Sequence, residues 1–449
     1  MNFNLINPLQ RGEDTPGRTG NGLNRFLTFA ALAGLFLLCM LGLARGNSAA
    51  TNYTVHEWGT FTSVQGGDGQ LLSWRPLQSS ELPGFVYDWS KAGLNRGTQQ
   101  LGFKVSLFTL QRMETPVMYF YADQPINVDV NVAFPLGNIT EWYPQATQIG
   151  PTYARDSNGP TSSILHESRA IWKNLQITPS SADDEKLLPQ DKCGSHYFAA
   201  RGPHSDFIRT DNSLSTNNTS ELEKFIFYRG AGSFATPLHV TVDSNNLVTV
   251  QNTGSNSLAH LFLLSIHAGL GSFSELDELA ASNSMSWLQL TASSTDHWKH
   301  YPLPQFQTEI AAQMQAALVD QGLFPDEAKA MVDTWKDSWF TEDGVRVLYI
   351  LPRPWTDGIL PLALTPQPTE LTRVMVGRAE IITPDTVNSL FQTLTKVADG
   401  DADARLQAKQ EFKKLGRFAE PALQLALSAN KTSKPFEMGF GWDLIHGAP

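Results

Sequence analysis

The chain has 449 residues, of which 41% are hydrophobic, and this length is enough for two or three domains of roughly 100 to 200 residues each. Its formal net charge of -11 argues against nucleic acid as a partner, because proteins hold phosphate backbones with clustered Lys and Arg. Charged residues make up only 17%, below the roughly 25% usual for globular domains. We therefore expect an acidic, folded protein rich in uncharged polar side chains.

Residues 1–50 have the features of an export signal. Arginines precede an apolar run over residues 26–43, and small residues follow it up to Ala50. This order predicts a secretory signal peptide cleaved after Ala50. The run is also just long enough to cross a bilayer, so an uncleaved membrane anchor is the alternative. In both cases the chain after Ala50 is exported, to the periplasm, the exterior or the outer face of the inner membrane, and only the N-terminal segment meets the membrane.

Residues 51–270 have the pattern of β-structure. In residues 126–134 every even position is apolar and most odd positions are polar, which is typical of a strand with one buried face. Other strands are expected over 103–110, 117–121, 171–177, 196–200, 225–228, 238–242, 247–251 and 259–267. Many short strands separated by Gly, Asn, Pro and Ser predict one or two antiparallel β-sandwiches.

The pattern changes to α+β over residues 271–382 and to helices over 383–449. Pro325 is expected to begin one helix, and Thr383 caps another whose first residue is Pro384. Residues 403–427 form a helical hairpin divided at Gly416 and resemble one HEAT-type helix pair. A single pair cannot bury its own apolar face, so we expect it to brace the rest of the protein or a partner. The predicted fold class is mainly β with an α+β C-terminal part and a terminal helical hairpin.

Several phrases of the sequence resemble those of a family of large secreted bacterial proteins. They are HEWGTFT (56–62), RMETPVMYFY (112–121), EWYP (141–144), KFIFYRG (224–230) and RVMVGR (373–378). The family is uncharacterised and has no assigned activity. The resemblance therefore implies export and a bacterial source, and it assigns no catalytic residue.

Glu57 interrupts an apolar strand face. In YTVHEWGTFTSV (53–64) it lies between Val55 and Phe61, where an unpaired charge would be costly. Arg112 is the expected partner, on a strand that we expect to end before Pro116. Three interpretations stay open: a structural ion pair, a β-bulge at Gly59 that turns Glu57 to solvent, and a functional acid.

The opposite face of the same strand carries His56 and Trp58. An imidazole beside an indole on a polar face could bind a carbohydrate, and Trp142 is a further candidate. The alternative is an aromatic side chain that covers a loop.

No cofactor and no metal site is predicted. Cys193 and His196 have the two-residue gap of a metal knuckle, but the sequence has no second cysteine pair to complete a zinc site. Cys39 lies in the export signal, so Cys193 is the only cysteine after Ala50 and cannot form an intrachain disulfide there.

Two hypotheses of function follow, and the sequence leaves open whether the protein is an enzyme. The first is an exported β-rich protein that binds or scaffolds at the cell exterior, with a carbohydrate or a cell-surface component as partner. The second is a secreted hydrolase of polysaccharide or another polymer that uses Glu57 and Glu114 with Arg112, since any fold can bring two acids together. Glycine-rich nucleotide motifs, nucleophile elbows and HExxH are missing from the sequence. The hypotheses differ in whether the three residues meet in an open cleft.

Overall fold

The computed structural model describes residues 52–78, 82–89, 107–150, 168–214, 218–290, 298–428 and 443–445. The predicted export signal and most of the predicted strand 103–110 lie outside these ranges. Within the ranges, no helix combines the length and the apolar character that crossing a membrane requires.

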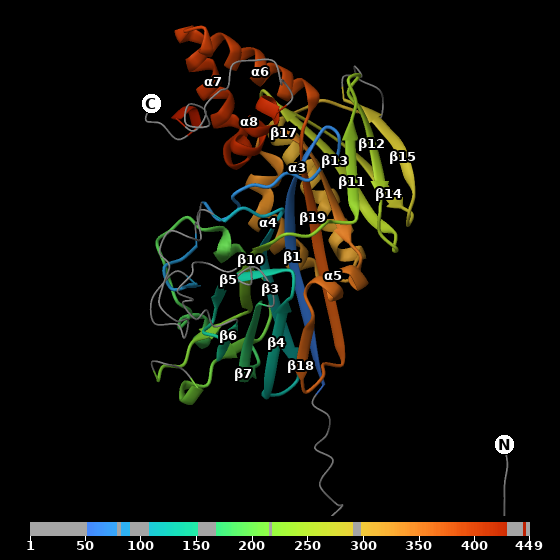
Figure 1. Ribbon diagram of the computed structural model, residues 1–449. Coiled ribbons are helices and arrows are strands. Elements are labelled where there is room, and N and C mark those ends of the chain that lie inside the picture. Colours follow the sequence, from blue (N-terminus) through green and yellow to red (C-terminus); the bar gives the residue numbers. More distant parts are fainter. Residues whose placement is uncertain are drawn as a thin grey trace, which may run out of the picture. The chain divides into compact units, whose positions relative to one another are not determined.

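A ten-stranded sheet in the described residues is the centre of the fold (Figure 1). In spatial order its strands are β16 (Tyr301–Pro302), β14 (Leu270–Leu279), β13 (Leu258–His267), β17 (Gly344–Leu351), β19 (Glu370–Ile382), β1 (Tyr53–Gly66), β3 (Gln111–Ala122), β10 (Ile226–Gly232), β5 (Gly137–Tyr143) and β2 (Tyr87–Asp88). β1 and β19 are parallel, and the other neighbours are antiparallel. The first strand of the described chain therefore pairs with the last.

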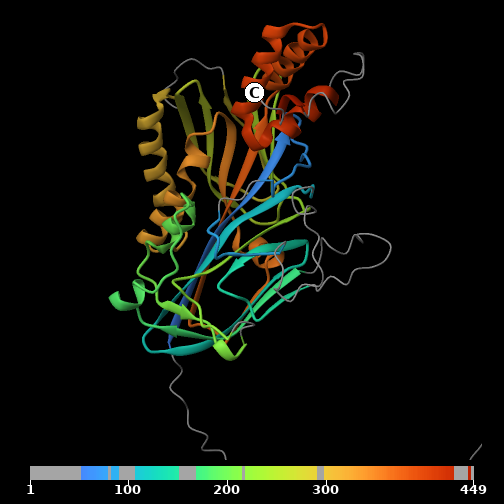
Figure 2. The ribbon, with the colours of Figure 1, turned by 90° about the vertical axis from the view of Figure 1, so that its left-hand side faces the viewer.

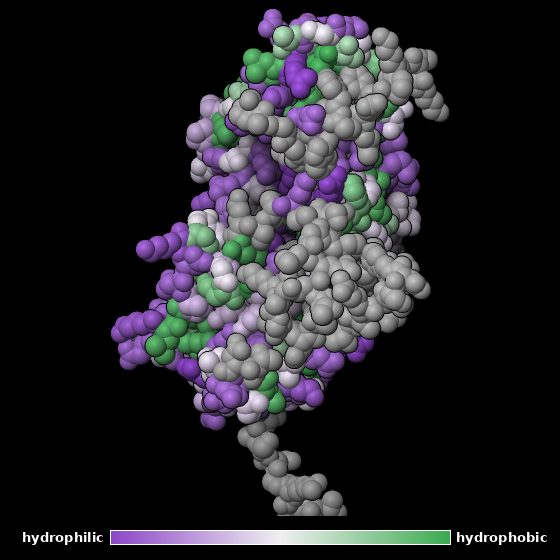
Figure 3. Space-filling model, turned by 60° about the vertical axis from the view of Figure 1, so that its left-hand side comes forward, coloured by the Kyte–Doolittle hydropathy of each residue, from purple (hydrophilic) through white to green (hydrophobic). Residues whose placement is uncertain are grey.

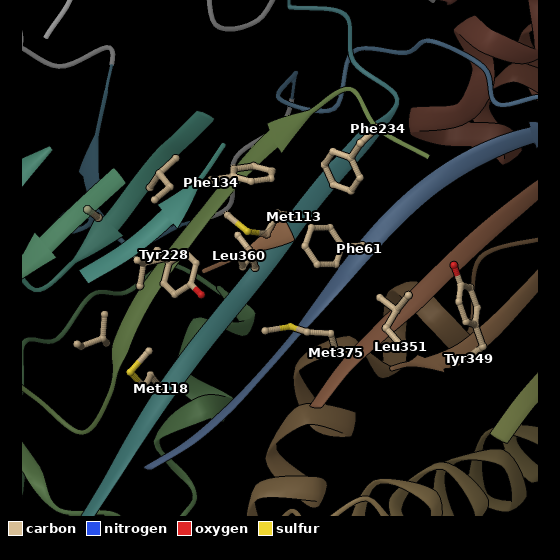
Figure 4. Close-up of a cluster of buried hydrophobic side chains, with 14 of the residues drawn as sticks. Phe61, Met113, Met118, Phe134, Tyr228, Phe234, Tyr349, Leu351, Leu360 and Met375 are labelled. Atoms are coloured by element: carbon tan, nitrogen blue, oxygen red, sulfur yellow. The ribbon is translucent and has the colours of Figure 1, made fainter. Parts of the chain in front are cut away.

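Two smaller antiparallel sheets share one core with this sheet. One has the order β18 (Leu362–Thr365), β4 (Ile126–Phe134), β7 (Ser168–Thr178), β8 (Phe207–Arg209) and β9 (Leu222–Glu223), with β6 (Gln148–Gly150) beside β7. The other consists of β11 (Leu238–Val242), β12 (Leu247–Asn252) and β15 (Ser284–Gln289). Their apolar side chains pack with Val55 and Phe61 of β1. Figure 4 shows part of this core, where Phe61, Met113 and Met375 come from three adjacent central strands.

Helices cover the other face of the central sheet. α3 (Leu303–Asp320) and α4 (Pro325–Phe340) bury Ile310, Met314 and Met331 against Trp58 and other residues of that face. In Figure 2 these gold helices and the teal strands of the six-stranded sheet lie on opposite sides of β1. Shorter helices are α2 (Ala182–Glu185), η3 (His196–Arg201), η4 (Asn212–Leu214) and α5 (Arg353–Ile359). Both faces of β1 are thus buried.

The C-terminal helices brace one end of the central strands. They are α6 (Pro384–Ala398), α7 (Ala402–Leu415), η5 (Gly416–Phe418) and α8 (Ala419–Ser428). Thr383 caps α6 by accepting a hydrogen bond from the Thr386 N–H, as predicted. The hairpin α7–α8 packs with α6 around Val64, Trp74 and Ile382, so the bracing interpretation is confirmed.

The fold class is confirmed, whereas some details differ from the prediction. β17 and β19 come from the predicted α+β region but belong to the central sheet. The expected boundary at residue 270 therefore does not separate two domains, because strands from both sides of it form one sheet within the compact unit Asn52–Pro449. The strand predicted at 196–200 is wrong, because Ser195 Oγ accepts the Tyr197 N–H at 3.2 Å and starts the helix η3.

Candidate functional site

Glu57 is completely buried and ion-paired, but not with Arg112. In the parallel register of β1 and β19 it lies opposite Arg373, whose Nε donates to Glu57 Oε2 at 2.5 Å. Tyr228 OH donates to the other carboxylate oxygen. Arg373 Nη1 also donates to Asp357 Oδ1 at 2.7 Å and to the Leu360 carbonyl at 2.8 Å. We call these four charged or phenolic residues, Glu57, Tyr228, Asp357 and Arg373, the Glu57 cluster.

Arg112 and Glu114 lie on the opposite face of the sheet. On β3 they pair with Thr62 and Thr60, whereas Glu57 pairs with Met118. Paired residues of an antiparallel ladder share a face, and the faces alternate along β1. The expected Glu57–Arg112 pair is therefore wrong, and Glu57 does not meet Glu114 in one cleft.

The β-bulge lies on β3, opposite Gly59 and not at Gly59 as expected, because between the pairs Trp58–Val117 and Thr60–Glu114 β1 advances by two residues and β3 by three. The register of β1 and β3 shifts between Trp58 and Thr60, and β3 continues through Pro116 instead of ending before it. A Cβ on Gly59 would lie 3.0 Å from the Pro116 Cα, which explains the glycine. The bulge does not turn Glu57 to solvent, because β18, β4 and their neighbours cover that face.

The three predicted binding residues His56, Trp58 and Trp142 are buried, with at most 1% of their surface exposed. His56 Nδ1 lies 2.8 Å from Glu327 Oε2 at the start of α4. Trp58 packs under α3 and α4, and Trp142 lies in the core shared by the sheets. A sugar cannot stack on these rings in this structure, so the expectation of an exposed His–Trp surface is wrong.

Cys193 and His196 do not form part of a metal-binding group. Cys193 has a free thiol and is half-exposed, and its backbone N–H donates a hydrogen bond to Asp191 Oδ1. His196 Nδ1 lies 4.0 Å from Asp337 Oδ2 on α4. Nowhere in the described ranges do three His, Cys, Asp or Glu side chains gather as ligands of a metal ion.

A band of buried charged side chains crosses the helix-covered face of the central sheet. Its members lie on β5, β10, β3, β19 and β17, together with Glu342, which follows α4, and Arg417, which lies in η5. We call this set the charged band: Glu141, Arg229, Arg112, Glu114, Arg378, Glu380, Arg346, Glu342 and Arg417.

Each glutamate of the charged band has a close arginine partner. The pairs are Arg229–Glu141 at 2.8 Å, Arg417–Glu114 at 2.6 Å, Arg378–Glu342 at 2.7 Å and Arg346–Glu380 at 3.0 Å. Arg378 also lies 2.8 Å from Glu380. Arg112 differs, because its nearest carboxylate oxygen, Glu114 Oε1, is 3.9 Å from its Nε.

A cleft of about 320 Å³ opens onto the charged band. Arg112, Glu114, Arg229 and Arg417 line it from the sheet and from η5. The other wall comes from η3, with His196, and from the C-terminal half of α4. On the face shown in Figure 3, hydrophilic side chains gather around a hollow in the upper half, and hydrophobic ones form small separate groups. Of the predicted catalytic residues, the cleft therefore contains Arg112 and Glu114 but not Glu57.

The charges around the cleft shift one another's pKa values. Burial alone would raise the pKa of Glu114, but Arg417, Arg112 and Arg378 outweigh burial and lower it to about 2. Burial lowers the pKa of Arg112 to about 10 although the Glu114 carboxylate opposes the shift, and Arg229 and Arg417 act in the same direction as burial. At neutral pH, Glu114 is therefore an anion and Arg112 a cation.

Sequence reasoning missed Arg229 and Arg417. Arg229 precedes Gly230 and Arg417 follows Gly416, but the role of both arginines depends on contacts with residues far away in the sequence. The Arg417–Glu114 pair joins residues 303 positions apart. The one available signal was the arginine in KFIFYRG, a phrase of the family resemblance.

The comparisons with known proteins identify no relative. No family model and no curated protein matches the chain. Among solved structures, it is similar to the Fcho1 Mu homology domain of Danio rerio with bound Eps15 peptide, at 8% identity, 74% coverage of this chain, 97% coverage of that chain and a TM-score of 0.26. It is also similar to the yeast delta-COP-I mu-homology domain complexed with Dsl1 WxWxV peptide, at 8% identity, with 74% and 98% coverage and a TM-score of 0.25. At these scores the likeness carries no argument about this chain.

Proposed function

We propose that the chain is an exported bacterial protein that acts at the cell exterior by binding a ligand in the cleft on the charged band. The N-terminal signal pattern supports export. The observation that carries the binding proposal is the cleft itself, a hollow of about 320 Å³ whose floor holds arginines fixed by buried ion pairs. Clefts with a few well-placed polar groups are the usual ligand sites of proteins.

Polymer hydrolysis is less well supported, because its acid pair is not assembled. A glycosidase needs one carboxyl group with a raised pKa as general acid and a second carboxylate within about 5 to 10 Å. Glu57 lies beneath the opposite face, and the pKa values of Glu114 and Glu342 in the cleft are both lowered. Neither glutamate of the cleft is suited to donate a proton at neutral pH.

Binding in the cleft is tested by blocking it. The purified chain is screened by thermal shift and equilibrium dialysis against exterior glycans, peptidoglycan fragments and small anions, and a His196→Trp variant places an indole at the opening of the cleft. We expect at least one class to bind without being cleaved and to lose affinity in His196→Trp. Cleavage products, or a ligand that binds His196→Trp as well as the original chain, would contradict the proposal.

Export is tested separately with a reporter. Alkaline phosphatase fused after residue 60 is active only outside the cytoplasm, so the fusion should be active and a fusion that lacks residues 26–43 should not be. Equal activity of both fusions would refute the predicted signal.

A further inference from the structure

Arg112 differs from the other arginines of the charged band in its distance from a carboxylate. The band has five arginines, residues 112, 229, 346, 378 and 417, and four glutamates, residues 114, 141, 342 and 380, and Asp88, opposite Glu141, adds a negative charge near Arg229. Each glutamate is within 3.0 Å of an arginine other than Arg112. The carboxylate oxygen nearest to Arg112 is 3.9 Å from its Nε, beyond hydrogen-bonding distance.

Arg112 makes no hydrogen bond with any described residue. Its side chain is 9% exposed, and its Nε is buried without an acceptor. Glu114 attracts Arg112 electrostatically but gives it no hydrogen bond, because Oε1 accepts from Arg417 Nη1 at 2.6 Å and is 3.9 Å from Arg112 Nε. A buried guanidinium nitrogen without an acceptor is costly, since it has lost water and gained no hydrogen bond in return.

The surroundings of Arg112 would favour an anion rather than a neutral ligand. Arg112 lines the open cleft, so a ligand can approach it. Arg229 and Arg417 line the same cleft and add positive potential, while their own partners Glu141 and Glu114 hold them in place. Three carboxylates also line the cleft: Glu114 and Glu342 are paired with Arg417 and Arg378, and Asp337, at the His196 side, is largely exposed and therefore screened by water.

We propose that Arg112 binds an anionic oxygen group, a carboxylate, phosphate or sulfate, on the ligand of this cleft. The inference rests on the proposed binding function and names the chemistry of its ligand. A guanidinium offers a planar fork of donors that matches two oxygens of such a group. The anion would supply the hydrogen-bond acceptors that Arg112 lacks among the described residues.

The test measures anion binding by the purified chain at constant ionic strength. The probes are inorganic phosphate, inorganic sulfate and acetate, titrated against chloride while the melting temperature is recorded. The variants are Arg112→Gln, which removes the charge, and Arg112→Lys, which keeps the charge without the fork. Arg209→Gln is the matched control, because Arg209 is a half-exposed arginine on β8 with a 3.4 Å contact to Asp184 and does not line the cleft.

We expect saturable stabilisation by at least one probe, at least tenfold weaker binding in Arg112→Gln, intermediate binding in Arg112→Lys, and unchanged binding in Arg209→Gln. Comparison of the three probes then shows which anion fits. Equal binding by Arg112→Gln and the original chain, or no saturable effect of any probe, would overturn the inference. If an uncharged ligand binds and only His196→Trp abolishes that binding, the inference fails while the proposed binding function stands.

Discussion

Buried charged side chains have different partners on the two faces of strand β1. On one face Glu57 and Arg373 are sealed in a core, where Tyr228 and Asp357 add hydrogen bonds to the pair and only Arg373 Nη2 has no partner among the described residues. On the other face the charged band lies under α4 and opens to a cleft, where Arg112 has no hydrogen bond among the described residues. The closed face thus has an arginine with several acceptors, and the open face has an arginine with none in the described part of the chain.

This difference separates structural charges from candidate functional ones. A buried ion pair whose polar atoms are mostly satisfied is weak evidence of function, since its replacement by apolar residues is often tolerated. An incompletely satisfied buried cation beside a cleft is a better candidate, because only a ligand can complete its partners. Mutations on the two faces should therefore change the free energy of unfolding by different amounts or in different directions.

The largest effect is expected for Glu57→Gln. It removes the negative partner of Arg373 and should destabilise the protein by about 3–5 kcal/mol, as breaking one side of a buried pair does. Urea unfolding followed by circular dichroism measures the change. In the control, Glu57→Gln combined with Arg373→Met should recover much of the loss; a double variant as unstable as the sum of both single variants would show that the two side chains are not coupled.

A smaller loss is expected for Glu114→Gln on the open face. This change leaves Arg417 without its carboxylate and removes the negative charge nearest to Arg112. We expect a loss of about 2–3 kcal/mol, at the low end for a buried pair because Arg417 is partly exposed. The same unfolding assay measures it. Stability equal to that of the original chain would mean that the charged band does not depend on charge balance.

Acid should reduce the contribution of Glu114. Its pKa is lowered from 4.5 to about 2 in the folded protein, so its contribution is complete above about pH 4.5 and is lost as the pH falls towards 2. The original chain should therefore lose stability more steeply across this window than Glu114→Gln, which has no such group. Parallel slopes of the two proteins in a pH series of urea unfolding would contradict this assignment.

Local patterns predicted much of the fold but not the partners of the charges. The alternation of residues 126–134 gave β4 with its bounds, and Thr383 with Pro384 gave the start of α6. The burial of Glu57 was also predictable from its neighbours. Arg373 was not, because it lies 316 positions away on a parallel strand, and pairing of distant parallel strands leaves no local signal.

The open face was misjudged for a related reason. The threonines Thr60 and Thr62 led to the prediction that this face of β1 is polar and exposed. The helices α3 and α4 instead bury this face, including His56 and Trp58. Arg112 was selected correctly as a residue of interest but assigned to the wrong face, since the bulge on β3, opposite Gly59, changes the register between β1 and β3. A bulge of one residue reverses which side chains share a face.

The smallest expected effect gives the most direct test of the account. Without ligand, Arg112→Gln removes a cation that makes no hydrogen bond with the described residues and should leave the free energy of unfolding unchanged or raise it by up to about 1 kcal/mol, since an incompletely bonded buried cation is a cost. The measurement is equilibrium unfolding of Arg112→Gln beside the original chain in a buffer free of polyvalent anions. A loss of stability in Arg112→Gln as large as that in Glu114→Gln would show that Arg112 is a structural partner of Glu114 and would contradict the account.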